Sequence, residues 1–409
     1  MKSMVKPNNK GEFYLLGYAT YIIYYFYIRS GYASISFFSF LSKGLRLLCL
    51  VFLAIHVLIN NKINFSWKSA VFFGLFIIVS VYSYLGGGYS NLIFVCAFIF
   101  LGITVDFNSI LNIGKNTIIA SLLFVFLSCK AGIIRDNVYT HSVLNMDAHT
   151  WGFNYYSFPQ TMITTCIFII LFQKGKRCKY RDYIVALLVS YISYQIFTTR
   201  VCFYGVIIMV FLLFMVNNLK ILQFKKKIWK YFVSIIYFAM CGLTVFSTIF
   251  YNSFNEHWRK LNGFLSGRLR MLERAYAEYD INMLGQKVVN IGNVEKALDA
   301  SLSGSIYIDC GYMYSLFAYG IIFTLLVLMA YTNLFRKAYK QRDVILCIWL
   351  LVLSIMNVIN NYLVSPVSNP LLILAFAVTF DSMKKSDFRS KFSQRHGEPS
   401  GVTSVLGGF

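Results

Sequence analysis

The sequence predicts an all-α membrane protein, a polytopic helical bundle with about twelve transmembrane helices. Hydrophobic residues make up 58% of the 409 residues and charged residues only 13%, whereas soluble proteins carry about 25% charged residues. Aromatic residues, which collect at membrane interfaces, reach 18%. The chain has only 5 prolines and no long polar tract, so we expect one integral membrane domain over residues 1–409.

A transmembrane helix needs about 20 mainly apolar residues. This rule places spans near residues 13–29, 42–60, 69–85, 89–105, 116–134, 158–173, 183–199, 201–218, 229–250, 310–335, 344–361 and 365–382. Two connections between spans are very short. One is the glycine run at 86–88, and the other is the Thr198-Thr199-Arg200 turn.

Lys and Arg residues concentrate in alternate loops, which predicts the orientation of the chain. With the N-terminus in the cytoplasm, the basic clusters at 174–181, 225–230 and 336–342 are cytoplasmic, and so is a C-terminal tail over 383–409. Lys43 and Arg46 are the pair that does not fit this pattern. The net charge of +22 therefore indicates membrane topology and not a nucleic-acid partner.

Two longer segments, about 130–158 and 251–309, then lie on the outer face of the membrane. The larger one is expected to be partly helical. Five of its residues fall near one helical face: Leu269, Leu272, Ala275, Tyr276 and Tyr279.

Arginines dominate this outer face and are the candidate ligands for an anionic substrate. A guanidinium stays charged and presents a fork of donors that matches phosphate oxygens. Arg200 is the strongest candidate, because it stands in a very short turn between two apolar helices, where an unpartnered charge is costly. We expect a diphosphate to be bound by a set that also includes Arg135, Arg268, Arg270 and Arg274.

Candidate acid–base groups on the outer face are fewer. His257 could take a proton from a sugar hydroxyl, with His141 and His149 as further external histidines. Asp309 stands where the long loop re-enters the membrane, and Asp136 could pair with the neighbouring Arg135. The 9 cysteines form no CxxC pair, and no metal-binding or phosphate-loop motif is present, so we expect neither a metal nor a cofactor.

Several short motifs in these positions resemble the bacterial polysaccharide polymerases of the Wzy family. In the stretch SGRLRMLERAYAEYDINMLGQ ten residues separate Arg274 from Gly285, a spacing associated with these enzymes. The later stretch IDCGYMYSLFAYG is similar to the family's Asp before the re-entering helix and its Tyr-Gly within it. The Thr-Thr-Arg turn, the stretch WGFNYYSFPQ after Arg135 and the stretch NNYLVSPVSNPLLIL also resemble parts of the family.

The resemblance implies a glycosyltransferase of the bacterial plasma membrane that needs no metal. Such an enzyme joins undecaprenyl-diphosphate-linked repeat units into O-antigen or capsular polysaccharide at the outer face. Its partners would be a lipid-linked donor and acceptor, membrane lipids and a chain-length regulator. Arginines would stabilise the diphosphate leaving group, Tyr312 would contact substrate, and His257 or an outer carboxylate such as Asp309 would act as base.

Other functions remain open at this point. An O-antigen ligase shares the fold and the chemistry. A polysaccharide flippase or another transporter is the non-enzymatic alternative, although no internal repeat is visible. A metal-dependent carrier-linked glycosyltransferase would need a carboxylate pair in the first outer loop, and residues 30–41 contain none.

Overall fold

The computed structural model describes residues 11–35, 39–59, 67–87, 90–141, 146–219, 227–265, 267–288 and 308–384. The expected loop and tail segments at 220–226, 289–307 and 385–409 therefore lie outside the described residues. The α-helices are α1 (Glu12–Ile28), α2 (Ser39–Ile59), α3 (Trp67–Gly87), α4 (Ser90–Leu101), α5 (Phe107–Lys130), α6 (Ser157–Lys174), α7 (Tyr180–Phe197), α8 (Arg200–Asn217), α9 (Lys227–Ile249), α10 (Glu256–Phe264), α11 (Arg268–Glu278), α13 (Gly311–Lys340), α14 (Val344–Met356) and α15 (Leu371–Lys384). Three 3-10 helices, η2 (Gly31–Ser34), η4 (Gly102–Thr104) and η5 (Gly175–Arg177), and an antiparallel pair of strands, β1 (Val138–His141) and β2 (Met146–His149), accompany them.

A helix lies over each of the twelve ranges expected to span the membrane, which confirms the helical class. Among the described helices, α2, α3, α5, α8, α9 and α13 are long and apolar enough to cross a membrane. The remaining helices over expected spans do not meet both criteria. The chain thus has the architecture of a multi-pass helical membrane protein, while the number of twelve crossings stays a prediction.

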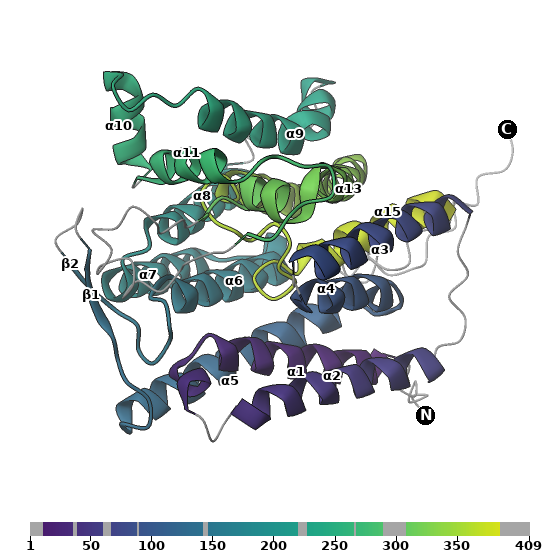
Figure 1. Cartoon of the computed structure of the whole chain (residues 1–409), viewed down its shortest axis with the longest axis horizontal. Helices are drawn as coiled ribbons and strands as arrows, with labels where there is room; N and C mark the ends of the chain where they lie inside the picture. The colour runs from purple at the N-terminus through teal and green to yellow at the C-terminus, as the bar shows by residue number, and fades with distance from the viewer. Residues whose placement is uncertain are drawn as a thin grey trace, which may run out of the picture.

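The helices run roughly side by side (Figure 1). Their buried side chains build two apolar clusters. The larger cluster surrounds α13, which packs against α9, α15, α3 and α14. The smaller cluster contains the tyrosine-rich α1, which packs against α2 and α5. One end of the bundle, here called the loop end, carries β1, β2 and α10, whereas α1 begins and α15 ends at the opposite, terminal end (Figure 1).

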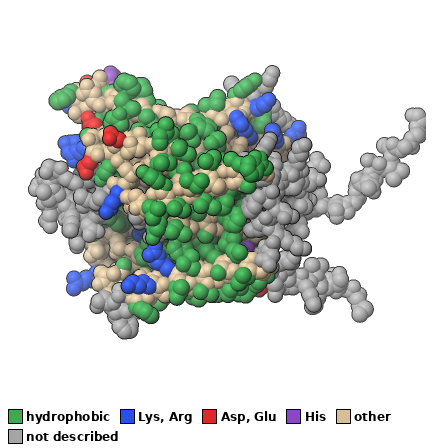
Figure 2. All heavy atoms as spheres, turned by 45° about the vertical axis from the view of Figure 1, so that its right-hand side comes forward, with side chains coloured by type: hydrophobic (Ala, Val, Ile, Leu, Met, Phe, Trp, Pro, Cys, Tyr) green, Lys and Arg blue, Asp and Glu red, His purple; other side chains and the backbone are tan. Residues whose placement is uncertain are grey.

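Apolar side chains also cover the outside of the bundle. Figure 2 shows them as a broad band between the two ends, and most of the visible charged side chains gather toward those ends. Large side chains on α2, α3 and α7, including Leu47, Ile78 and Leu188, are exposed. An apolar surface of this extent is suited to contact with lipid chains.

Three helix boundaries differ from the sequence prediction, and the first has a clear physical cause. Helix α5 begins at Phe107, well before the expected residue 116, because the side chain of Asp106 caps it by accepting a hydrogen bond from the Ser109 amide at 2.8 Å. Helix α14 ends at Met356 and α15 begins only at Leu371. The intervening segment 357–370 is not helical, although much of it is buried.

The two long loops also take shape at the loop end. The first, expected over 130–158, contains the β1–β2 hairpin, which the all-α prediction did not include. The second contains α10 and α11, which confirms that it is partly helical. On α11 the predicted apolar face is buried at Leu269, Leu272 and Ala275, and Tyr279 follows it, whereas Tyr276 is exposed.

Helix α13 is broken at Gly320, whose φ of 86° and ψ of 173° are not helical. Segment 282–286 of the long loop runs alongside this break. The amides of Ile321 and Ile322 donate to the carbonyls of Asn282 and Met283 at 3.0 and 3.2 Å. Because the inserted segment accepts these bonds, the interrupted helix leaves neither amide without a partner inside the bundle.

Gly285 of the inserted segment should be irreplaceable. It has a φ of 82°, and an added Cβ would overlap the carbonyl oxygen of Ala318. We expect Gly285→Ala to lower the free energy of unfolding by about 2 kcal/mol or more, measured by denaturant unfolding in detergent micelles.

The matched control is Gly242→Ala in α9, where an added Cβ meets no heavy atom within 4 Å. This change should leave the stability unaltered or raise it by up to about 1 kcal/mol. Equal stability of the two variants would show that segment 282–286 is not seated against α13 as described.

Candidate functional site

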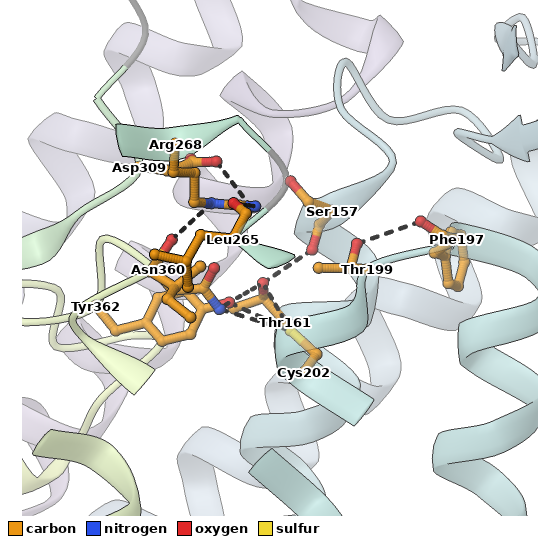
Figure 3. Close-up of polar contacts among 11 residues, drawn as sticks. Ser157, Thr161, Phe197, Thr199, Cys202, Leu265, Arg268, Asp309, Asn360 and Tyr362 are labelled. Atoms are coloured by element: carbon orange, nitrogen blue, oxygen red, sulfur yellow. Dashed lines mark hydrogen bonds and ion pairs between the residues drawn. The ribbon is translucent and has the colours of Figure 1, made fainter. Parts of the chain in front are cut away.

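A polar site lies at the loop end, where five parts of the chain meet. Figure 3 shows Arg268 at the start of α11 and Asp309 just before α13, next to the non-helical segment 357–370. The first turns of α6 and α8 contribute Thr161 and Cys202 from the other side (Figure 3). The site therefore combines residues that are far apart in the sequence.

The guanidinium of Arg268 is held in three directions. Its Nε donates to the carbonyl of Ile359 at 3.1 Å and its Nη1 donates to the carbonyl of Leu265 at 3.3 Å. Its Nη2 lies 3.1 Å from Oδ2 of Asp309, and the two side chains are only 20% and 26% exposed. At this low exposure the ion pair is shielded from solvent more than an ordinary surface pair. Through its contacts with Asp309 and Ile359, Arg268 joins the start of α11 to the residues just before α13 and to segment 357–370.

The turn between α10 and α11 gives Arg268 its position. Gly267, with a φ of 82°, precedes it and allows the chain to reverse direction. The amide of Gly267 donates to the carbonyl of Asn262, and the Asn262 side chain accepts from the Arg270 amide at 3.1 Å. Because these bonds fix the first turn of α11, its apolar face packs inward and Arg268 reaches the bundle.

A second polar cluster lies beneath the ion pair. The hydroxyl of Tyr362 lies 2.5 Å from Oγ1 of Thr161 and accepts a hydrogen bond from Nδ2 of Asn360 at 2.8 Å. Thr161 in turn donates to the carbonyl of Ser157 at 2.8 Å, and the thiol of Cys202 lies 3.4 Å from the Tyr362 hydroxyl. These contacts bind segment 357–370 to α6 and α8.

Donors that lack acceptors lie in the short turn between α7 and α8 and on α6 beside it. Oε1 of the fully buried Gln160 accepts from the Thr199 amide at 2.8 Å, but its Nε2 and the Oγ1 of Thr198 are buried without a hydrogen-bond partner. Arg200, the first residue of α8, is half-buried. No hydrogen bond or ion pair joins its guanidinium to another described residue. Unsatisfied buried donors are unfavourable, and here they adjoin the N-terminus of α8, which Arg200 begins.

Two tyrosines and one arginine belong to this region although the sequence prediction did not include them. Burial raises the pKa of Tyr156, Asp309 raises it further, and Arg268 opposes this rise. Burial also raises the pKa of Tyr155; the charge of Arg29 lowers this pKa, and that of Asp309 raises it. Arg29 follows the last residue of α1, at a predicted outer helix end, and this position is the sequence signal that could have identified it.

The other predicted residues lie elsewhere. Arg270 and Arg274 are on the exposed face of α11, and His257 is exposed in the first turn of α10. Arg135 is exposed beside Asp136. Tyr312 is buried in the core and donates to the carbonyl of Ser354 at 2.9 Å.

The expected pairing of Asp136 with Arg135 is not the one that the structure has. Asp136 instead lies 2.8 Å from Nδ1 of His149 and accepts a hydrogen bond from the Trp151 amide at 2.7 Å. The carboxylate therefore joins the start of the hairpin to its end.

Within the residues that the structure describes, no three His, Cys, Asp or Glu side chains are grouped as metal ligands would be. The chemistry that the arrangement offers is the binding of an anionic group by arginines and amide donors, with Asp309 as the nearest carboxylate. No protein-family model, no curated protein and no solved structure matches this chain, so the site rests on its own geometry.

Replacement of Arg268 should affect stability, because lysine cannot donate in three directions from one rigid plane. We expect Arg268→Lys to lower the free energy of unfolding by about 1–3 kcal/mol, since the carbonyls of Ile359 and Leu265 each lose a donor. Denaturant unfolding in detergent measures this change. Arg270→Lys, an exposed position on the same helix, should change the stability by less than about 0.5 kcal/mol, and an equal effect at both positions would argue against the described role of Arg268.

Proposed function

We propose that this chain is a glycosyltransferase of the bacterial plasma membrane, which polymerises oligosaccharide repeat units carried on undecaprenyl diphosphate. In this proposal the chain crosses the membrane twelve times, the loop end faces outward and both termini are cytoplasmic. The product is O-antigen or capsular polysaccharide. The motifs that resemble the Wzy family and the polar site at the loop end support this function together.

The observation that carries the proposal is the unused donor capacity around Arg200. Arg200 is half-buried at the start of α8, and the residue before it, Thr199, contacts Gln160, whose Nε2 has no hydrogen-bond partner. A diphosphate oxygen would accept hydrogen bonds from the Arg200 guanidinium and from amides at the start of α8, and would compensate the charge of Arg200. Two or three such charge-assisted bonds, at about 1.5–3 kcal/mol each, would give much of the affinity for the head group.

The reaction requires a leaving-group site and a base. In the transfer step, the acceptor hydroxyl attacks the anomeric carbon of the donor sugar, the bond to the diphosphate breaks, and a base takes the hydroxyl proton. Arg200 would stabilise the negative charge that develops on the diphosphate. Asp309 is the better candidate base by position, because it lies in the polar site, whereas His257 lies exposed on α10.

Transport of a lipid-linked glycan is the second candidate function, and one observation favours it. Helix α13 is interrupted at Gly320, and the buried segment 357–370 separates α14 from α15. Broken helices are common at the substrate sites of transporters. Ligation of the finished glycan to a lipid acceptor would use the same diphosphate chemistry as polymerisation.

Deletion of the gene separates these functions when surface glycan is resolved on a gel. Loss of a polymerase should leave single repeat units, because the units still reach the outer face. Loss of a flippase should leave almost no repeat units there. Loss of a ligase should leave polymer that is not joined to its final acceptor. Either of the last two patterns would refute the polymerase proposal.

A lysine at position 200 tests the proposed diphosphate contact, since it keeps the charge but loses the fork of donors. We expect Arg200→Lys to insert normally and to slow polymerisation tens- to hundreds-fold, which corresponds to a loss of a few kcal/mol in the transition state. The gel reports chain length, and an immunoblot reports the amount of protein in the membrane. Arg181→Lys, an exposed change in the first turn of α7, at the opposite end of that helix, should leave the polymer unchanged. Full-length polymer in both variants would show that Arg200 does not contact the leaving group.

Cysteine labelling tests the proposed orientation. In a background without reactive cysteines, Lys260→Cys on α10 should react with an impermeant maleimide added to intact cells, whereas Lys176→Cys in η5 should not. Both side chains are exposed, so accessibility within the protein is matched. Labelling of Lys176→Cys from outside would reverse the orientation.

A further inference from the structure

A polar contact joins the early part of α9 to the late part of α13. Nε of Arg336 donates to Oγ of Ser234 at 2.9 Å, and this hydroxyl donates to the carbonyl of Lys230 at 2.7 Å. Further along, the rings of Tyr237 and Tyr331 stack with centroids 5.0 Å apart, so the two helices run in opposite directions. Because α9 continues from the contact to the loop end, where α10 follows it, the contact lies toward the terminal end (Figure 1).

The contact holds Arg336 at the surface. The side chain is exposed, and Ser234 uses only its Nε. No described residue accepts a hydrogen bond from its Nη1 or Nη2 or forms an ion pair with it. The guanidinium is therefore fixed in position while most of its donors remain available.

Two exposed lysines lie one helical turn from this contact. Lys230 is four residues before Ser234, and Lys340 is four residues after Arg336, so each shares a side of its helix with its partner in the contact. Since α9 and α13 are antiparallel, both lysines lie about 6 Å nearer the terminal end than the contact itself. Three cations from two helices thus gather at one place on the surface.

The charge of these cations is poorly compensated within the described part of the chain. Neither α9 nor α13 contains Asp or Glu. Asp343, in the connection after α13, accepts the Leu346 amide at 3.0 Å and so caps α14. Lys230 also lies in the first turn of α9, where the helix dipole disfavours a cation. An anion bound at this place would relieve both effects.

Apolar side chains continue from Arg336 along the same side of α13. Leu325 and Met329 precede it by eleven and seven residues, spacings that return to one side of a helix, and they are 42% and 40% exposed. In Figure 2, a group of Lys and Arg side chains borders the area of hydrophobic side chains at the upper right of the view. Cations at the end of an exposed apolar strip match a molecule with an anionic head group and a hydrocarbon chain.

We propose that Lys230 and Arg336 bind the phosphate head group of an anionic phospholipid of the bilayer, with one acyl chain along Leu325 and Met329. The lysine supplies a point charge, and the guanidinium held by Ser234 presents Nη1 and Nη2 to the phosphate oxygens. This site lies away from the polar site at the loop end, and it does not depend on the proposed function.

Native mass spectrometry of the purified protein with added lipids tests the proposal. The wild-type protein should retain phosphatidylglycerol in preference to phosphatidylcholine. The variant Lys230→Gln/Arg336→Gln should bind phosphatidylglycerol about tenfold or more weakly, because two charge-assisted contacts are lost. The control variant Lys176→Gln/Arg181→Gln removes the same charge near the start of α7, where the Asp182 carboxylate lies close to Arg181, and should bind like the wild type.

Ser234→Ala separates a positioned head-group site from a diffuse basic surface, because it keeps every charge and removes only the contact that holds Arg336. We expect it to weaken the binding of phosphatidylglycerol about threefold, and it carries the test if the double variant does not fold. Undiminished binding by Ser234→Ala or by Lys230→Gln/Arg336→Gln would overturn the proposal. Retention of a polyprenyl diphosphate but not of phosphatidylglycerol would overturn the assignment to a bilayer lipid.

Discussion

The site depends on one constraint: the carbonyls of a buried, non-helical segment need hydrogen-bond donors. Segment 357–370 lies inside the bundle, where each unpaired carbonyl would be costly. Tyrosine hydroxyls from two different helices supply donors: Tyr331 bonds to the carbonyl of Leu363 at 2.9 Å, and Tyr18 bonds to that of Pro366 at 2.8 Å. Arg268 does the same for Ile359, so the ion pair with Asp309 rests on a backbone that is fixed by the core.

The helices could be predicted from the sequence because long apolar runs are a local signal. Hydropathy located a helix over every expected span, yet it missed the first turns of α5, because a capping bond from Asp106 lets the helix start in a more polar stretch. Residues 357–361 and 365–370 were taken as helix for the same reason. These residues are apolar enough for a span, and only contacts with distant side chains show that they adopt another conformation.

The sequence suggested residue types for the candidate site but not their pairings. Asp309, Arg200 and Arg268 were all recognised from the sequence, but spacing could not show that Arg268 is committed to three acceptors while Arg200 is not. The contribution of Gln160 was not foreseen, since it arises from the approach of α6 to the α7–α8 turn. Arginines that look equivalent in sequence thus differ in how much hydrogen-bonding capacity is free for a ligand.

The contact between segment 282–286 and the break in α13 also bears on how the chain is made. The acceptors at Asn282 and Met283 precede α13 in the sequence and so leave the ribosome before it. When α13 enters the membrane, the partners for its amides at Ile321 and Ile322 are therefore already synthesised. A truncated chain that begins at α13 would have to place these amides in lipid without acceptors, so this helix is poorly suited to independent insertion.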